Sequence, residues 1–320
     1  MTRADKAVEH VPPRTIAEDT ILLDLGFQGT AGVIGAFLLA GQDELALIET
    51  GPTTTRAALE RGIREAGYAL ADVTRLIVTH IHLDHAGAAG VLMREFPDMR
   101  LLVHPNGAPH MIDPDRLLRS AGRIYGDRMG ELWGEVAGID PDRVDIIQDG
   151  DRVEVAGRML HVRDAPGHAS TQVVLLDERT GLLFTGDAAG ARVTGTGYVC
   201  PTLAPPELDF ALWARTVETM RELRPSALAL THFGRVNDPE RHLDAIMPEI
   251  ERQERLAREV LRSEADLDRL TEHLLAMERE RYAAEGVDVE AAMAALQLAM
   301  PAWLASLGLL RVFRKAGRIG

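Results

Sequence analysis

The sequence reads Thr79-His80-Ile81-His82-Leu83-Asp84-His85-Ala86-Gly87 at the point that decides its fold. Four side chains that can bind a metal lie here within six residues, directly after an apolar segment at residues 76–79 that is typical of a buried strand. His80 and His82 can converge on one ion from an extended loop, whereas Asp84 and His85 can turn toward a second ion beside it. Imidazole and carboxylate ligands together suit zinc, and also iron or manganese.

Three more polar residues follow apolar segments later in the chain. His168 ends Ala165-Pro166-Gly167-His168, Asp187 ends Thr185-Gly186-Asp187, and His232 ends Leu230-Thr231-His232. One short motif cannot complete two coordination spheres, so the remaining ligands must come from such turns. We therefore expect all three side chains to reach a shared cleft at the edge of a sheet.

Taken in order, these residues resemble the His-x-His-x-Asp-His, then His, then Asp, then His pattern of the metallo-β-lactamase superfamily. The resemblance runs over about residues 21–233, and it implies an α/β fold, the αββα sandwich of that superfamily. It also implies a ligand set. By this resemblance His80, His82 and His168 would hold a first metal, Asp84, His85 and His232 a second, and Asp187 would bridge them.

The chemistry that this resemblance implies is hydrolysis by a hydroxide shared between two divalent metal ions, with zinc expected first and iron or manganese as alternatives. Asp84 would orient that hydroxide or pass its proton to the leaving group. Tyr198, at the end of a Gly-rich loop at residues 190–197, is predicted to donate to an oxyanion. No Ser or Cys nucleophile is required.

Four other polar residues near the expected cleft could orient ligands or contact the substrate. Glu49, in Glu49-Thr50-Gly51, resembles the Asp of an Asp-Thr-Gly turn in this superfamily and could orient ligands, although a simple turn is an equal alternative. Arg192 could bind a carboxylate or phosphate from the Gly-rich loop. His104 and His110 are expected not to be metal ligands, although substrate contacts stay open for both.

The apolar patterns predict a catalytic domain at residues 18–236 and a helical C-terminal region at residues 237–320. Asp149-Gly150-Asp151 has the residues of a tight hairpin turn between strands at residues 144–147 and 152–155. A helical segment at residues 109–136 could cover a pocket, and the last helix, at residues 293–313, could dock on the body or on another subunit. Specificity is expected between that segment and the C-terminal helices.

Charge and composition limit the partners. The 49 acidic and 35 basic residues give a net charge of -14, which argues against a nucleic-acid partner and against anionic membranes. The single cysteine, Cys200, cannot form an internal disulfide and fits a reducing compartment. With no signal-like or membrane-spanning segment, the sequence predicts a cytoplasmic enzyme for a small-molecule substrate, with a homodimer as a hypothesis.

Three activities share this motif. The first is hydrolysis of an ester, thioester or lactone, similar to the glyoxalase II-like and lactonase branches, although no basic cluster for a glutathione thioester is visible in this acidic sequence. The second is a mononuclear iron oxygenase similar to persulfide dioxygenases, which use fewer of the ligands. The third is a two-metal phosphodiesterase, which the negative charge disfavours. The presence of His232 favours two metals.

Overall fold

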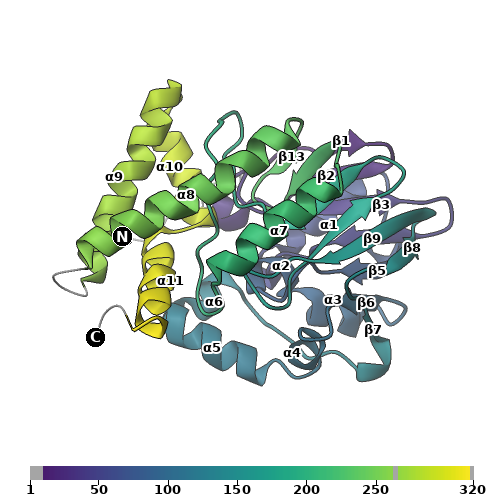
Figure 1. Cartoon of the computed structure of the whole chain (residues 1–320). Helices are drawn as coiled ribbons and strands as arrows, with labels where there is room; N and C mark the ends of the chain where they lie inside the picture. The colour runs from purple at the N-terminus through teal and green to yellow at the C-terminus, as the bar shows by residue number, and fades with distance from the viewer. Residues whose placement is uncertain (1–9, 262–265, 318–320) are drawn as a thin grey trace.

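Two sheets packed face to face form the centre of the molecule, with helices on both outer faces (Figure 1). The computed structural model describes residues 10–261 and 266–317. The first sheet has seven strands in chain order: β1 (Arg14–Ala17), β2 (Thr20–Asp24), β3 (Gly35–Ala40), β4 (Leu45–Ile48), β5 (Val73–Ile77), β6 (Arg100–Val103) and β7 (Val144–Ile146). It is antiparallel from β1 to β4 and parallel from β4 to β7.

The second sheet has the strand order β13-β12-β11-β10-β9-β8, and only its β11–β12 pair is parallel. Its strands are β8 (Arg152–Val155), β9 (Arg158–Asp164), β10 (Val173–Asp177), β11 (Leu182–Gly186), β12 (Ala227–Leu230) and β13 (Gly234–Val236). The predicted αββα sandwich is therefore confirmed. The sequence patterns did not predict β1 or β13.

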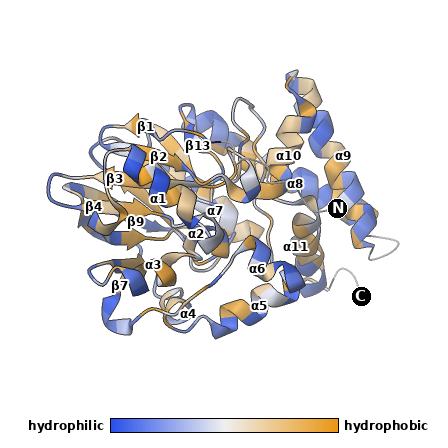
Figure 2. Ribbon diagram, turned by 180° about the vertical axis from the view of Figure 1, so that it is seen from behind, coloured by the Kyte–Doolittle hydropathy of each residue, from blue (hydrophilic) through white to orange (hydrophobic). Residues whose placement is uncertain are grey.

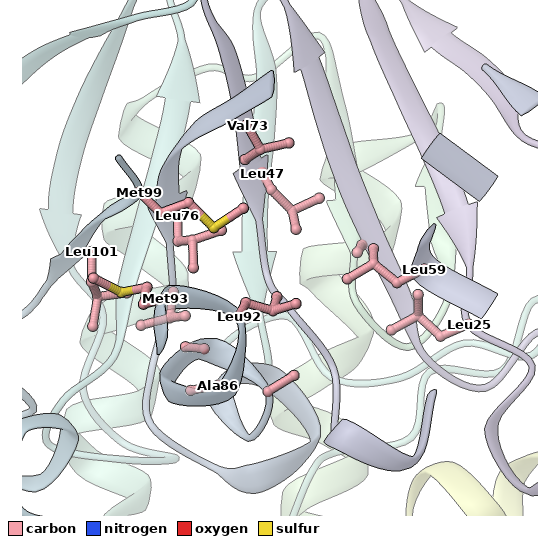
Figure 3. Close-up of a cluster of buried hydrophobic side chains, with 14 of the residues drawn as sticks. Leu25, Leu47, Leu59, Val73, Leu76, Ala86, Leu92, Met93, Met99 and Leu101 are labelled. Carbon is pink, nitrogen blue, oxygen red and sulfur yellow. The ribbon is translucent and has the colours of Figure 1, made fainter. Parts of the chain in front are cut away.

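Alternation along the strands sends side chains to opposite faces of each sheet. Phe37 of β3 and Phe184 of β11 meet between the sheets, with ring centroids 5.2 Å apart. On the outer face of the first sheet, Leu47 and Leu76 pack against helices α1 (Arg56–Glu65) and α3 (Ala89–Glu95) (Figure 3). Burying strands on both faces requires nearly continuous apolar runs, and Figure 2 shows orange along the strands of the sandwich.

The second sheet is covered by α7 (Phe210–Glu222) and α8 (Pro239–Val260). The same core cluster continues into α9 (Leu267–Glu285) and α11 (Ala302–Lys315), where Leu270, Leu309 and Phe313 are buried. The C-terminal helices thus share a core with the sandwich. The last helix therefore docks on the body of the same chain, which was one of the two placements expected for it. The homodimer stays a prediction, and so does the boundary between two domains at residue 236.

The predicted helical segment at residues 109–136 is three short helices, which are α4 (Ala108–Ile112), α5 (Asp115–Tyr125) and α6 (Met129–Leu132). The predicted last helix is divided into α10 (Val289–Ala299) and α11 at Pro301, because proline disfavours a helical residue before it. Among the described residues no one helix is long and apolar enough to cross a bilayer, and α10 and α11, bent by 51°, pass that test only as a pair.

The predicted hairpin at Gly150 is wrong. Gly150 has a positive φ of 85°, as a tight turn requires, but β7 belongs to the first sheet and β8 to the second. The turn therefore carries the chain from one sheet to the other. The residues of the turn determine that the chain reverses at Gly150. Which strand β8 pairs with is determined by packing against residues far away in the sequence.

Candidate metal centre

The predicted ligands lie at one edge of the sandwich, on loops that follow strands. The loop after β5 carries His80 and His82 and leads into α2 (Leu83–Ala86), a single helical turn that holds Asp84 and His85. His168, Asp187 and His232 follow β9, β11 and β12. The structure brings all seven residues together, in two groups whose ligand atoms each lie within 4.8 Å of one another: His80, His82, His168 and Asp187 in the first, and Asp84, His85 and His232 in the second.

The first group is a triangle of imidazole nitrogens. Nδ1 of His82 lies 3.0 Å from Nε2 of His80 and 2.9 Å from Nε2 of His168. Oδ2 of Asp187 lies 3.3 Å from the same His168 nitrogen. Three imidazole nitrogens and a carboxylate oxygen therefore face one point.

The second group faces the other oxygen of Asp187. Nε2 of His85 lies 3.2 Å from Oδ1 of Asp187, and Nε2 of His232 lies 3.5 Å from that atom. Oδ2 of Asp84 lies 3.3 Å from the His232 nitrogen and 3.7 Å from the His85 nitrogen. The Asp187 carboxylate therefore lies between the two groups and presents one oxygen to each.

Backbone and carboxylate acceptors hold the histidine rings from behind. Nδ1 of His168 donates to the carbonyl of Thr202, and Nδ1 of His232 donates to the carbonyl of Val33, both at 2.7 Å. A carbonyl can only accept, so Nδ1 of each ring carries a proton, and in the neutral ring the lone pair of Nε2 points into the site. This is the usual arrangement behind a metal-binding histidine.

The inward-facing atoms fit a metal ion. Within the described part of the chain, Nε2 of His85, Nε2 of His232 and Oδ1 of Asp187 are buried and have no hydrogen-bond partner. A buried polar atom without a partner is costly, and a bound ion is one established reason for it. The donor set of imidazoles and carboxylates is the one that zinc, iron and manganese accept.

Comparison with known proteins identifies the family. The family model of the Metallo-beta-lactamase superfamily matches residues 26–232. The chain belongs to the metallo-β-lactamase superfamily. Its sequence is 29% identical over 184 residues to the metallo-beta-lactamase fold-containing protein ST1585 of Sulfurisphaera tokodaii, covering 56% of this chain and 68% of that protein.

Two further relatives are informative. An N-acyl homoserine lactonase, AttM of Rhizobium radiobacter, is 32% identical over 129 residues, which are 40% of this chain and 45% of the lactonase. The crystal structure of the metallo-beta-lactamase family protein TTHA1429 from Thermus thermophilus matches with a TM-score of 0.63 at 23% identity and covers 96% of both chains. At that identity the structural match shows the shared fold, C-terminal helices included.

Metallo-β-lactamase-fold enzymes are mostly hydrolytic metalloenzymes, and the protonation of the first ligand group and of Asp84 suits divalent metal binding. Burial lowers the pKa of His80 and His168, and lowers the pKa of His82 to about 4, so these rings are neutral at pH 7. Burial opposes the ionisation of Asp84, but the neighbouring histidines outweigh it and lower the pKa of Asp84 to about 2. Neutral imidazoles and ionised carboxylates are the forms that bind metal.

Glu49 lies behind the metal-binding histidines. Its side chain is fully buried, and its backbone has a positive φ of 65°. Oε1 of Glu49 accepts hydrogen bonds from Nδ1 of His85 at 2.9 Å and from the hydroxyl of Thr79 at 2.5 Å. The Thr79 hydroxyl also lies 3.1 Å from Nδ1 of His80. Of the two readings left open for Glu49, the contacts favour the one in which it orients ligands.

Replacing Glu49 with glutamine is expected to weaken metal affinity by about 10- to 100-fold, the usual cost of losing a group that orients a metal ligand. The amide keeps the shape but loses the charge that holds the His85 proton. Competition titration with a metal chelator measures this affinity. Glu95→Gln, which removes a carboxylate from an exposed ion pair with Arg56, is the matched control, and equal affinity in both variants would contradict the role given to Glu49.

Tyr198 does not lie where the sequence placed it. The side chain is buried between the Gly-rich loop and α9, with its ring 5.4 Å from that of Tyr282, and it does not line the cavity that contains the metal-binding groups. A loop that begins beside Asp187 turns away from the site through the bridge between Ala191 and Cys200. The predicted role of Tyr198 as an oxyanion donor therefore has no support in the structure.

The other polar residues are placed as follows. Arg192 donates to the carbonyl of Thr196 and pairs with Asp238 at 3.3 Å, so it holds its own loop. His104 accepts from the backbone of Asn106 and is in neither ligand group, whereas His110 lines the cavity. Cys200 is buried and burial raises the pKa of its thiol, so it does not supply a thiolate nucleophile.

A cavity of about 810 Å³ opens from the metal-binding residues His82, Asp84 and Asp187. Its walls are α5 and the α10–α11 junction, which is where the sequence placed specificity. An aromatic row follows one wall: Tyr125 of α5 contacts Trp133 and Trp303 with ring centroids 5.1 and 5.9 Å apart. The cavity also contains arginines from both helices, which sequence reasoning missed because they are far apart in the chain.

Proposed function

We propose that this chain is a binuclear metallo-hydrolase that cleaves an ester, thioester or lactone of a small molecule. The observation that carries the proposal is the Asp187 carboxylate, which presents one oxygen to each of two histidine groups. The second group, with Asp84, His85 and His232, is complete, and this supports two metals over the single iron of an oxygenase. We expect zinc first, with iron or manganese as alternatives.

In this mechanism His80, His82 and His168 would hold one ion, Asp84, His85 and His232 the other, and Asp187 both. Two bound divalent ions would supply a nucleophilic water of lowered pKa and polarise the substrate carbonyl. Asp84 lines the cavity and uses Oδ2 for its histidine contacts, which leaves Oδ1 to hold a proton from the water and pass it on. The acyl C–O or C–S bond breaks, the carbon gains the water oxygen, and the leaving alcohol or thiol takes the proton.

A lactone as substrate is supported by the partial match to AttM, an N-acyl homoserine lactonase. The cavity supports all three carbonyl substrates because it opens from the metal-binding residues and part of its wall is apolar and aromatic. A net charge of -14 opposes long polyanionic substrates such as RNA, which disfavours a phosphodiesterase of nucleic acid.

The direct test pairs metal analysis with a substrate panel. Protein purified without added metal is analysed for metal per chain, and turnover is measured on a thioester, a lactone, a carboxylic ester and a phosphodiester. We expect about two zinc or manganese ions per chain and hydrolysis of a carbonyl substrate. One iron per chain, with oxygen consumption on a persulfide and no hydrolysis, would overturn the proposal.

The two ions should differ in their response to pH. In the metal-free protein, burial disfavours protonated His85 and His232, but the carboxylates of Asp187 and Asp84 outweigh it and raise the pKa of both rings. Metal must therefore displace protons from the second group, while the rings of the first group are already neutral. Affinity at the second group rises with pH and is lost first as pH falls.

We therefore expect the metal content to fall from about two to about one ion per chain when pH is lowered from about 8 to about 6. Equilibrium dialysis against a fixed free-zinc concentration at each pH, followed by metal analysis, measures this. Loss of both ions in a single step, or no loss above the pH at which the protein unfolds, would contradict the unequal protonation of the two groups.

A further inference from the structure

Four arginines face the cavity from two helices that are separate in sequence and adjacent in space (Figure 1). Arg116 and Arg123 belong to α5, and Arg311 and Arg314 belong to α11. All four are exposed side chains that line the same cavity as Asp84 and Asp187. The cavity thus joins a metal-binding end to a cationic region.

The spacing of these arginines keeps each pair on one face of its helix. Arg116, Ser120 and Arg123 are separated by four and three residues, and all three line the cavity. Arg311 and Arg314, three residues apart, follow Leu307 on the cavity side of α11. Both helices therefore turn a cationic stripe toward the same space.

These four guanidinium groups form no ion pair or hydrogen bond with any residue in the parts of the chain that the structure describes. A neighbouring cation on α5 behaves differently: Arg119 pairs with Asp115 at 3.7 Å and does not line the cavity. In a chain with 49 acidic and 35 basic residues, four guanidinium groups without acidic partners on two adjacent helices favour a positive potential at that side of the cavity, whereas the acidic lining residues Asp84, Asp187 and Glu207 lie on other elements. Such a potential attracts an anion.

Apolar side chains of the same two helices also line the cavity. Leu117 and Ile124 of α5 face the cavity together with Leu304 and Leu307 of α11. A ligand that touched both ends would carry a carbonyl at the metals, an apolar or weakly polar linker along these side chains, and an anion at the arginines.

From this arrangement we propose that the cavity binds a phosphate-bearing ester or thioester, with the phosphate held by Arg116, Arg123, Arg311 and Arg314. Guanidinium groups bind phosphate through paired N–H donors. A single carboxylate would occupy one guanidinium, whereas a phosphate carries about -1.5 to -2 charges and three acceptor oxygens. Four guanidiniums therefore match phosphate better than carboxylate. This inference rests on the proposed hydrolase function for its scissile bond.

The test compares two substrates with the same scissile bond. Butyryl-coenzyme A carries phosphates, and S-butyryl-N-acetylcysteamine has the same thioester without them. For the metal-loaded enzyme we expect kcat/KM to favour the first substrate. In the double variants R116Q/R123Q and R311Q/R314Q, this preference should fall at least about tenfold, mainly through KM, because each loses two charge-assisted contacts. The control variants R119Q and K315Q, on the same two helices but outside the cavity lining, should keep the wild-type preference.

Binding of S-butyl-coenzyme A, a thioether that cannot be hydrolysed, separates this inference from the proposed function. Calorimetric titration of the metal-loaded protein should show binding that is weakened about tenfold in each double variant and unchanged in R119Q and K315Q. That result supports the phosphate site even if no carbonyl substrate is turned over, in which case only the hydrolase proposal fails. Equal binding in all variants, no binding to the wild type, or hydrolysis without preference for the phosphate-bearing substrate would overturn the inference.

Discussion

Asp187→Asn is expected to lower kcat/KM for the carbonyl substrate by about 10³-fold or more and to reduce the bound metal. Losing one preorganised electrostatic contact in an active site typically costs about 10²- to 10³-fold. Asp187 contacts both histidine groups, with Oδ1 3.2 Å from His85 and Oδ2 3.3 Å from His168. An amide is neutral and replaces one of these oxygens with a donor, so it affects both groups at once.

Steady-state kinetics and metal analysis on the same protein preparation measure this effect, with circular dichroism to check the fold. Asp127→Asn, an exposed change in the turn after α5, is the control and should leave both quantities at the wild-type level. Normal metal content together with normal turnover in the Asp187 variant would remove Asp187 from the site and with it the two-metal proposal.

Phe184→Ala is expected to lower the free energy of unfolding by about 3–5 kcal/mol, the usual cost of emptying a buried phenylalanine site. Phe184 is fully buried between the sheets, where its ring packs edge-on against Phe37. Domains are typically stable by only about 5–15 kcal/mol, so this loss is a large share of the total. Phe184 lies on β11, the strand that leads to Asp187, so the metal-binding carboxylate should also become less well ordered.

Urea denaturation followed by circular dichroism, at a fixed metal concentration, measures this change. Leu212→Ala on α7, where the side chain is 36% exposed, is the control and should cost about 0.5 kcal/mol or less, as surface changes do. A similar midpoint for both variants would mean that the sheets do not depend on this aromatic contact.

The metal-binding residues could be predicted from sequence because each of them is set by local features. His80 lies three residues after β5 and Asp187 directly follows β11, and strands of one sandwich deliver the residues after them to a common edge. The pairing of strands could not be predicted in this way. Gly150 allows a tight turn between any two strands, and the sheet that each strand joins depends on the packing of the whole core. Tyr198 was misplaced for the same reason: its spacing from Asp187 allowed contact, but the direction of the loop is set by packing on α9.

The cationic cavity wall could not be read from the sequence either. Arg123 and Arg314 stand in ordinary amphipathic helices, and arginines on such helices are usually solvated or paired with acidic neighbours. Only the packing of α11 beside α5 shows that their faces meet over one cavity.

The break at Pro301 places the start of α11 against the cavity, and this part of the wall lies outside residues 26–232, the segment shared with the superfamily. Arg311 and Arg314 of the proposed phosphate site therefore lie outside the matched segment, whereas Arg116, Arg123 and the metal-binding residues lie inside it. On the proposals above, changes in the C-terminal helices would alter which molecules are accepted and would leave the metal-binding residues in place. Relatives that align only through the sandwich leave this part of the cavity wall without a counterpart for comparison.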